Sequence, residues 1–246
     1  MDPETWRWWT LLRATSVLNL LLLGWTAATV PLDGPNRAVQ LTCATIYVLV
    51  CGFRSFWPRV DLERTVLVDH PLSSIALGRT AATVAELVFT LQCALFVHGL
   101  GAHAVAWSLV PLIAVAQGCC WLGVLTQNHL WHAAEEALWA VMMAMLAVVF
   151  ISAAPGAAPA AALILGVVGC FAGAFVMAGV DIPMYVARWR SESAAGRRYL
   201  TVRAGFADAL HRRVPTGAWA VWRREVPWMT PYFSAAVWLS LGMVWL

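Results

Sequence analysis

The chain has 246 residues, of which 61% are hydrophobic and 12% are charged, and its mean hydropathy is +0.71. Soluble domains carry about 25% charged residues, so this composition predicts a protein that lies in a lipid bilayer. The chain contains no lysine, and arginine supplies all 16 of its basic side chains. This excludes chemistry that depends on a lysine Schiff base, including retinal-linked function. The net charge of +3 is ordinary for arginine-rich cytoplasmic loops and indicates no binding to nucleic acid.

Apolar runs that are long enough to cross a membrane occur seven times in the chain. Their expected ranges are 10–30, 38–57, 73–98, 103–126, 130–153, 158–187 and 229–246. We therefore expect an all-α integral membrane protein, a single domain over residues 1–246 that forms a polytopic bundle of seven transmembrane helices. The six cysteines lie within these runs without CxxC spacing, which indicates buried apolar side chains and no zinc site.

The arginines predict the orientation of these helices. They lie at the start of the first span and after the second and the sixth, which puts them on one side of a seven-span protein, and only Arg37 falls on the other side. Cytoplasmic loops carry the excess of arginine, so the N-terminus is expected in the cytoplasm and the C-terminus outside, in an inner or plasma membrane. In the segment 189–228, helical spacing places arginines on one face and aromatic side chains on the other. This pattern predicts amphipathic helices that lie in the headgroup layer or pack against the cytoplasmic end of the bundle.

The fifth span begins with a polar stripe. His129, His132, Glu135, Glu136 and Trp139 fall within about 120° of one helix face. The residues that follow are apolar, so the stripe enters the membrane. Ionisable groups inside a bilayer are costly and rare, and they mark functional sites by default.

Three further spans carry polar groups to the same, cytoplasmic half of the bundle. These groups are Arg79, Thr83, Glu86 and Thr90 in the third span, Gln117, Trp121 and Asn128 in and after the fourth, and Asp181, Tyr185 and Arg188 in the sixth. The topology therefore predicts a polar pocket at the cytoplasmic leaflet, covered by the segment 189–228. Each group also has a structural interpretation, such as Arg79 reaching lipid phosphates or Asp181 pairing with an arginine.

Carboxylates in such a pocket favour an enzyme that acts on a lipid or isoprenoid by acid–base chemistry, as a cyclase, isomerase or hydratase that needs no cofactor. The catalytic candidates are Glu86, Glu135, Glu136 and Asp181, with Glu136 or Glu86 as the acid. The candidates for substrate binding are Arg79, which would hold a headgroup, and Asn128, Trp121, Trp139 and Tyr185. The Glu135–Glu136 pair resembles the glutamate pair of integral-membrane lycopene cyclases, although the proline beside that pair is absent here and the resemblance covers only these two residues.

Two other functions stay open. His129, His132 and Glu135 lie one helical turn apart and suit iron, manganese or zinc, which would make the protein a metal-dependent oxidase or hydroxylase. Buried carboxylates near an arginine also suit a proton-coupled transporter or channel. Few ionisable groups in the outer half and no sign of discontinuous helices argue against transport. The expected partners are membrane lipids and a lipophilic small molecule, and the oligomeric state is not predicted.

Overall fold

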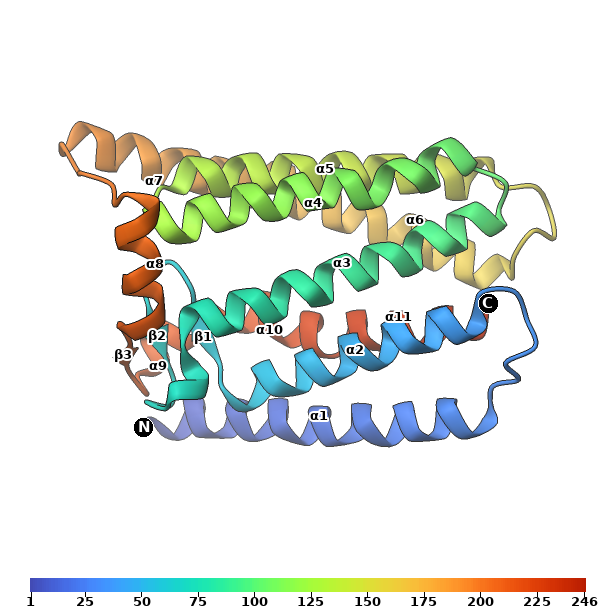
Figure 1. The fold of residues 1–246 in the computed structure, drawn as a ribbon, viewed down its shortest axis with the longest axis horizontal. Helices are drawn as coiled ribbons and strands as arrows, with labels where there is room; N and C mark the ends of the chain where they lie inside the picture. Colours follow the sequence, from blue (N-terminus) through green and yellow to red (C-terminus); the bar gives the residue numbers. More distant parts are fainter. The chain divides into compact units, whose positions relative to one another are not determined.

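The computed structural model describes all residues, 1–246, and is dominated by long apolar helices (Figure 1). Six of these are long and apolar enough to cross a membrane. They are α1 (Pro3–Thr29), α2 (Arg37–Phe56), α3 (Ile75–Gly99), α4 (His103–Thr126), α5 (His129–Ser152) and the continuous run Ala160–Ala194. The expectation of a helical membrane protein is confirmed at this level, whereas the seventh crossing and the orientation stay predictions.

The last expected span, 229–246, is not one continuous helix. It consists of α10 (Val226–Phe233) and α11 (Ala235–Met243), which are separated at Ser234 with φ −123° and ψ −78°. The sixth long run is also irregular, because α6 (Ala160–Phe175) continues through a π-helical turn, η2 (Val176–Asp181), into α7 (Ile182–Ala194). Neither interruption was predicted from the sequence. A π-helical turn inside an α-helix often marks a functional site.

The chain forms two compact units, and its expected organisation as a single domain stays a prediction. Unit 1 consists of residues 1–92 and 209–246, and unit 2 consists of residues 93–208. Helix α3 is shared, since its last residues belong to unit 2. The segment expected to hold amphipathic helices contains the end of α7, α8 (Val202–His211), and the short α9 (Trp219–Trp222). Its location in a headgroup layer remains a prediction.

Unit 1 is built around α1 and α2, which pack side by side, with α10 and α11 against both (Figure 1). A cluster of polar side chains ties three of its helices together. Gln92 of α3 is fully buried and donates to the carbonyl oxygens of Gln40 (3.0 Å) and Ser240 (3.1 Å). The Ser240 hydroxyl donates back to the Gln92 side chain. Buried polar groups in a membrane helix need such partners because lipid offers none.

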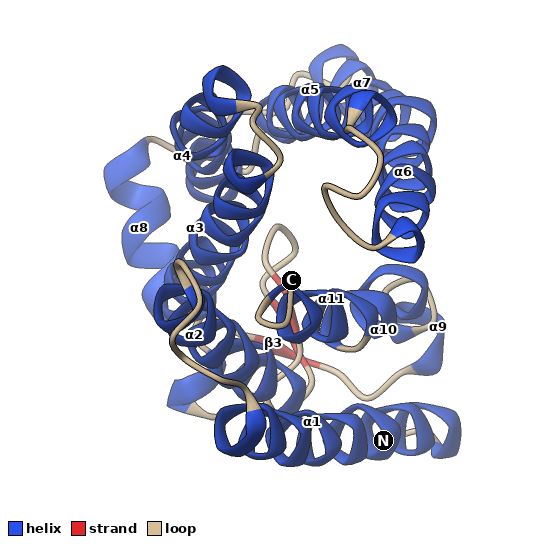
Figure 2. Ribbon diagram, turned by 90° about the vertical axis from the view of Figure 1, so that its right-hand side faces the viewer, coloured by secondary structure: helices blue, strands red, loops and turns tan.

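A small sheet at one end of unit 1 departs from the expected all-α fold. Strands β1 (Arg59–Val60) and β2 (Thr65–Val66) are antiparallel, and β3 (Val214–Pro215) pairs with β2 in parallel, as the red strands in Figure 2 show. The sheet is too short for a periodic sequence signal. The side chain of Arg59, in β1, is buried and donates to the carbonyl oxygens of Leu72 and Ser74. Burial lowers the pKa of the Arg59 guanidinium to about 10, with Asp61 opposing and Arg54 adding to the shift.

Unit 2 is a layered set of helices in which α4 packs on α5, and α5 packs on α6, η2 and α7. The turn between α4 and α5 is tight. Gln127 takes a left-handed conformation with φ 57°, and the Asn128 side chain accepts a hydrogen bond from the backbone of Leu130 at 3.0 Å. This N-cap starts α5 directly after α4 ends. The two helices therefore form an antiparallel hairpin, which positions the candidate site.

Candidate functional site

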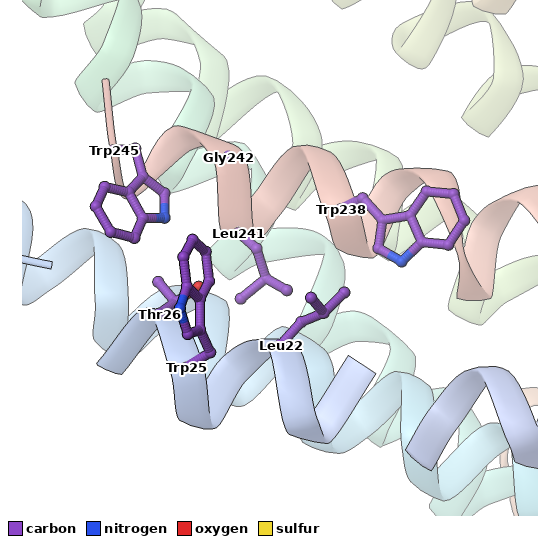
Figure 3. A pocket seen from close by; sticks show the side chains of 7 residues that line it. All are labelled: Leu22, Trp25, Thr26, Trp238, Leu241, Gly242 and Trp245. Atoms are coloured by element: carbon purple, nitrogen blue, oxygen red, sulfur yellow. The ribbon is translucent and has the colours of Figure 1, made fainter. Parts of the chain in front are cut away.

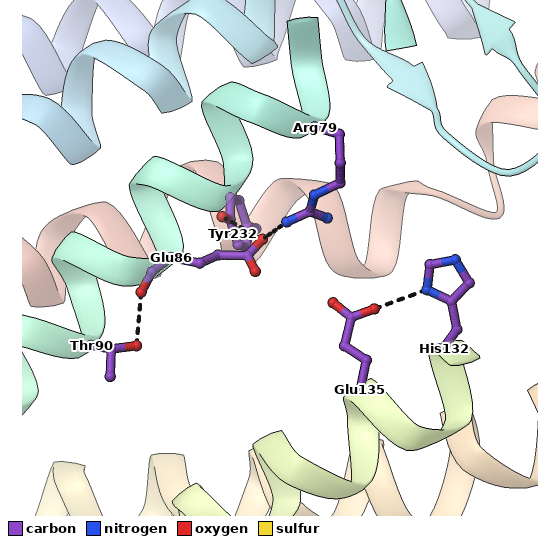
Figure 4. A network of polar contacts seen from close by, with 6 residues as sticks. All are labelled: Arg79, Glu86, Thr90, His132, Glu135 and Tyr232. Carbon is purple, nitrogen blue, oxygen red and sulfur yellow. Dashed lines mark hydrogen bonds and ion pairs between the residues drawn. The ribbon is translucent and has the colours of Figure 1, made fainter. Parts of the chain in front are cut away.

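The hairpin of α4 and α5 brings the first two turns of α5 against the last two turns of α4. His132 and Glu135 lie on adjacent turns of α5, and His132 Nδ1 is 2.9 Å from Glu135 Oε2 (Figure 4). Their relative exposures are 7% and 6%, so the pair is shielded from solvent. The other ring nitrogen, His132 Nε2, is buried and has no hydrogen-bond partner.

Cys120 of α4 completes a compact group with this pair. One ligand atom from each of Cys120, His132 and Glu135 lies within 4.8 Å of the others, and all three residues are buried. Cys120 was expected to be a buried apolar side chain, and its contact with this pair was not predicted from the sequence. The hairpin supplies the signal that was overlooked, because Cys120 and Glu135 are equally far from the Gln127–Asn128 turn and are therefore neighbours in antiparallel helices.

A glycine in α4 makes room for the imidazole. A Cβ atom added at Gly123 would lie 2.7 Å from both Cδ2 and Nε2 of His132, which is closer than real Cβ contacts occur. Gly123 lies three residues after Cys120, on the same face of α4. The His132 ring thus rests against the α4 backbone at the position where α4 also presents Cys120.

Tyr185 of α7 lies near several ionisable groups of unit 2. Its ring stacks on His132 with 5.3 Å between centroids and an interplanar angle of 27°. It also lies close enough to Glu136, Glu135, Asp181 and Cys120 to interact with them electrostatically. Of the four predicted catalytic carboxylates, the structure therefore gathers Glu135, Glu136 and Asp181 around one tyrosine. The π-helical turn that ends at Asp181 packs on α5 as well.

His129, predicted as a metal ligand, has a different partner. Its Nδ1 is 3.0 Å from Glu192 Oε2, and Glu192 also forms an ion pair with Arg197. His129 thus contacts the end of α7, whereas His132 and Glu135 lie beside Cys120 of α4. Asn128, predicted to bind substrate, serves as the N-cap of α5. Trp121 and Trp139 are half-buried in α4 and α5, and their role in substrate binding stays a prediction.

The remaining predicted residues, Arg79 and Glu86, form an ion pair in unit 1. Arg79 Nη2 is 2.8 Å from Glu86 Oε1, and the hydroxyl of Tyr232 donates to the same oxygen at 3.5 Å (Figure 4). The backbone carbonyl of Glu86 accepts from Thr90 at 2.7 Å. The pair is neutral as a unit, which lowers the cost of burying its two charges. The single polar pocket that the sequence predicts from four helices stays a prediction. The candidate site consists of residues of unit 2 alone.

An apolar groove of about 230 Å³ lies between α1 and α11 in unit 1 (Figure 3). It is lined by Leu22, Trp25, Thr26, Trp238, Leu241, Gly242 and Trp245. No ionisable side chain lines it, so the groove offers no group for acid–base chemistry or metal binding. Its composition suits contact with a lipid chain.

The chain was compared with protein-family models, curated proteins and solved structures, and it matches none of them. The functional conclusion therefore depends on the residues themselves.

Proposed function

We propose that the protein is an integral membrane enzyme that acts on a lipid or isoprenoid substrate by carboxylate acid–base chemistry. The observation that supports this proposal is the group of Glu135 and Glu136, in the largely apolar α5, and Asp181, at the end of η2, all close to Tyr185. Three acidic side chains in a low-dielectric setting are costly to keep without a function. The proposal includes seven spans, a cytoplasmic N-terminus and a site in the cytoplasmic leaflet, which the distribution of arginine favours.

The chemistry follows from the types of side chain present. Glu136, as a carboxylic acid, would transfer its proton to one carbon of a substrate double bond, which leaves a carbocation at the other carbon. The π-faces of Tyr185 and of nearby tryptophans stabilise a positive charge. The carboxylate of Asp181 or Glu135 would then remove a proton from an adjacent carbon. The reaction is a net isomerisation or cyclisation, so it requires no oxidant or reductant.

Each of the two alternative functions has one observation in its favour. The group of Cys120, His132 and Glu135 favours a metal-dependent reaction. The π-helical turn beside Asp181 and the break at Ser234 favour a carrier, because transporters build substrate sites from interrupted helices. The acid–base enzyme comes first because it uses all three carboxylates without requiring a polar path across the bilayer.

The test compares lipid extracts from cells that express the wild type, Glu136→Gln or Asp181→Asn at matched levels. Asp33→Asn is the control, since Asp33 is an exposed carboxylate in the α1–α2 loop. Losing a general acid or base lowers a rate by about 100-fold or more, so both site variants are expected to lose a product that Asp33→Asn retains. Extracts that are identical for all four proteins contradict the proposal. Proton uptake into proteoliposomes that disappears in Glu136→Gln would establish the carrier instead.

A further inference from the structure

We propose that Cys120, His132 and Glu135 bind a zinc ion in unit 2. Their ligand atoms already lie within 4.8 Å of one another, and all three side chains are buried. A tetrahedral zinc ion with bonds of about 2.0 to 2.3 Å separates its ligand atoms by about 3.3 to 3.7 Å. The observed spacing therefore exceeds the tetrahedral spacing by about 1.5 Å at most, which small movements of the three side chains would close.

The identity of the three donors points to zinc. Thiolate, imidazole and carboxylate are the ligand types that zinc accepts together, whereas magnesium and calcium bind oxygen donors. Three protein ligands leave a fourth position for water or substrate, which is the composition of catalytic rather than structural zinc sites. The hairpin of α4 and α5 holds the donors on two packed helices, so the site is organised before the metal arrives.

The surroundings of His132 give independent support. Its Nε2 atom is buried without a partner, and a buried polar atom without a partner indicates an absent ion, water or ligand. Gly123 makes space for the ring beside Cys120. The contact of 2.9 Å between His132 Nδ1 and Glu135 Oε2 orients the ring, so that Nε2 stays available to a metal ion.

A zinc ion here deepens the proposed function, because with Glu135 as a zinc ligand Asp181 is the remaining candidate for the base. Only the catalytic role of the zinc ion rests on the proposed function. Tyr185 contacts His132 and interacts electrostatically with Glu136 and Asp181, so the open coordination position would lie among the proposed acid–base groups. Zinc has no redox chemistry, and it acts as a Lewis acid that polarises a bound oxygen atom. The ion would thus favour substrates with a hydroxyl or carbonyl oxygen and disfavour the oxidase alternative.

The experiment measures metal in protein that has been purified in mild detergent, loaded with zinc sulfate and passed over a desalting column. Elemental analysis is expected to find about one zinc per chain in the wild type and at least about tenfold less in Cys120→Ser and His132→Ala. Cys119→Ser and His129→Ala are matched controls, one residue and one helical turn away, and both are expected to retain the metal. Loading with cobalt chloride adds a direct test, since the thiolate-to-cobalt absorption band should disappear in Cys120→Ser alone among the cysteine variants.

Two outcomes would overturn this site. One is a wild type that retains neither zinc nor cobalt although it elutes as a single folded species. Another is metal that His129→Ala removes and Cys120→Ser retains, which would return the ligand set to the one predicted from the sequence. Glu136→Gln separates this proposal from the proposed function, because it should retain zinc and lose product. Metal binding without any lipid product would therefore leave the zinc site standing and remove the enzyme assignment.

Discussion

The side chain of Asn19 is expected to stabilise the interruption between α10 and α11 by hydrogen bonds to both helices. Phe233 is the last residue of α10, so its carbonyl oxygen has no donor within that helix. The Asn19 side chain, on α1, donates to this oxygen at 2.8 Å and accepts from the indole of Trp238 at 2.9 Å. Asn19 is 2% exposed, so no water replaces either bond. The side chain thereby satisfies one group on each side of the break at Ser234.

Replacing Asn19 by leucine keeps most of the volume and removes both bonds. Hydrogen bonds between membrane helices contribute about 0.6 kcal/mol on average and about 1.7 kcal/mol at most, so the free energy of unfolding should fall by about 1–3 kcal/mol. Ser16→Ala is the control, because Ser16 lies one turn away on α1, is equally buried, and its hydroxyl has no partner. Removing that hydroxyl is expected to leave stability unchanged or slightly raised.

The assay is unfolding in mixed micelles by titration with sodium dodecyl sulfate, followed by the fluorescence of the 15 tryptophans. Asn19→Asp refines the test, since it keeps an acceptor for Trp238 and places a carboxylate oxygen against the Phe233 carbonyl. It should destabilise the protein at least as much as Asn19→Leu. Equal midpoints for Asn19→Leu, Ser16→Ala and the wild type would refute this account of the break.

Three further predictions concern other parts of the chain. Gly123→Ala should displace the His132 ring and lower bound zinc by at least about tenfold, whereas Gly118→Ala, which meets nothing within 4 Å, should leave the metal content unchanged; equal metal in both variants would contradict the role of Gly123. Gln92→Leu removes three buried hydrogen bonds and should destabilise unit 1 by about 2 kcal/mol, read from the same detergent titration. Alkaline phosphatase fused after residue 246 should be active and a fluorescent protein fused there should be dark if the C-terminus lies outside; the reverse result would exclude seven spans with a cytoplasmic N-terminus.

The long helices and the helix that carries most of the candidate site could be predicted from the sequence. Apolar length alone predicts six of the spans to within a few residues at most of their ends, because lipid leaves a backbone no alternative to the helix. The polar stripe of α5 was evident for a related reason, since His132, Glu135 and Glu136 interrupt an apolar run where each ionisable side chain is costly. Apolar length and the polar stripe are both properties of a single helix, so they can be recognised without knowing how the helices pack.

Contacts between helices were decided by the tertiary structure. Cys120 looks like any other small apolar residue in α4 until the Gln127–Asn128 turn sets the register of the hairpin and places it beside His132 and Glu135. His129 matched the metal-ligand spacing in the sequence, yet Glu192, 63 residues later in the chain, is its partner. The breaks at Val176–Asp181 and Ser234 leave no mark on hydropathy, because a change in backbone hydrogen bonding does not alter side-chain polarity. Apolar length and the cost of polar groups in lipid thus predict which segments are suited to a membrane and which helix carries charge. Only the packing of one helix on another decided which side chains meet, because that depends on register and rotation, which composition does not encode.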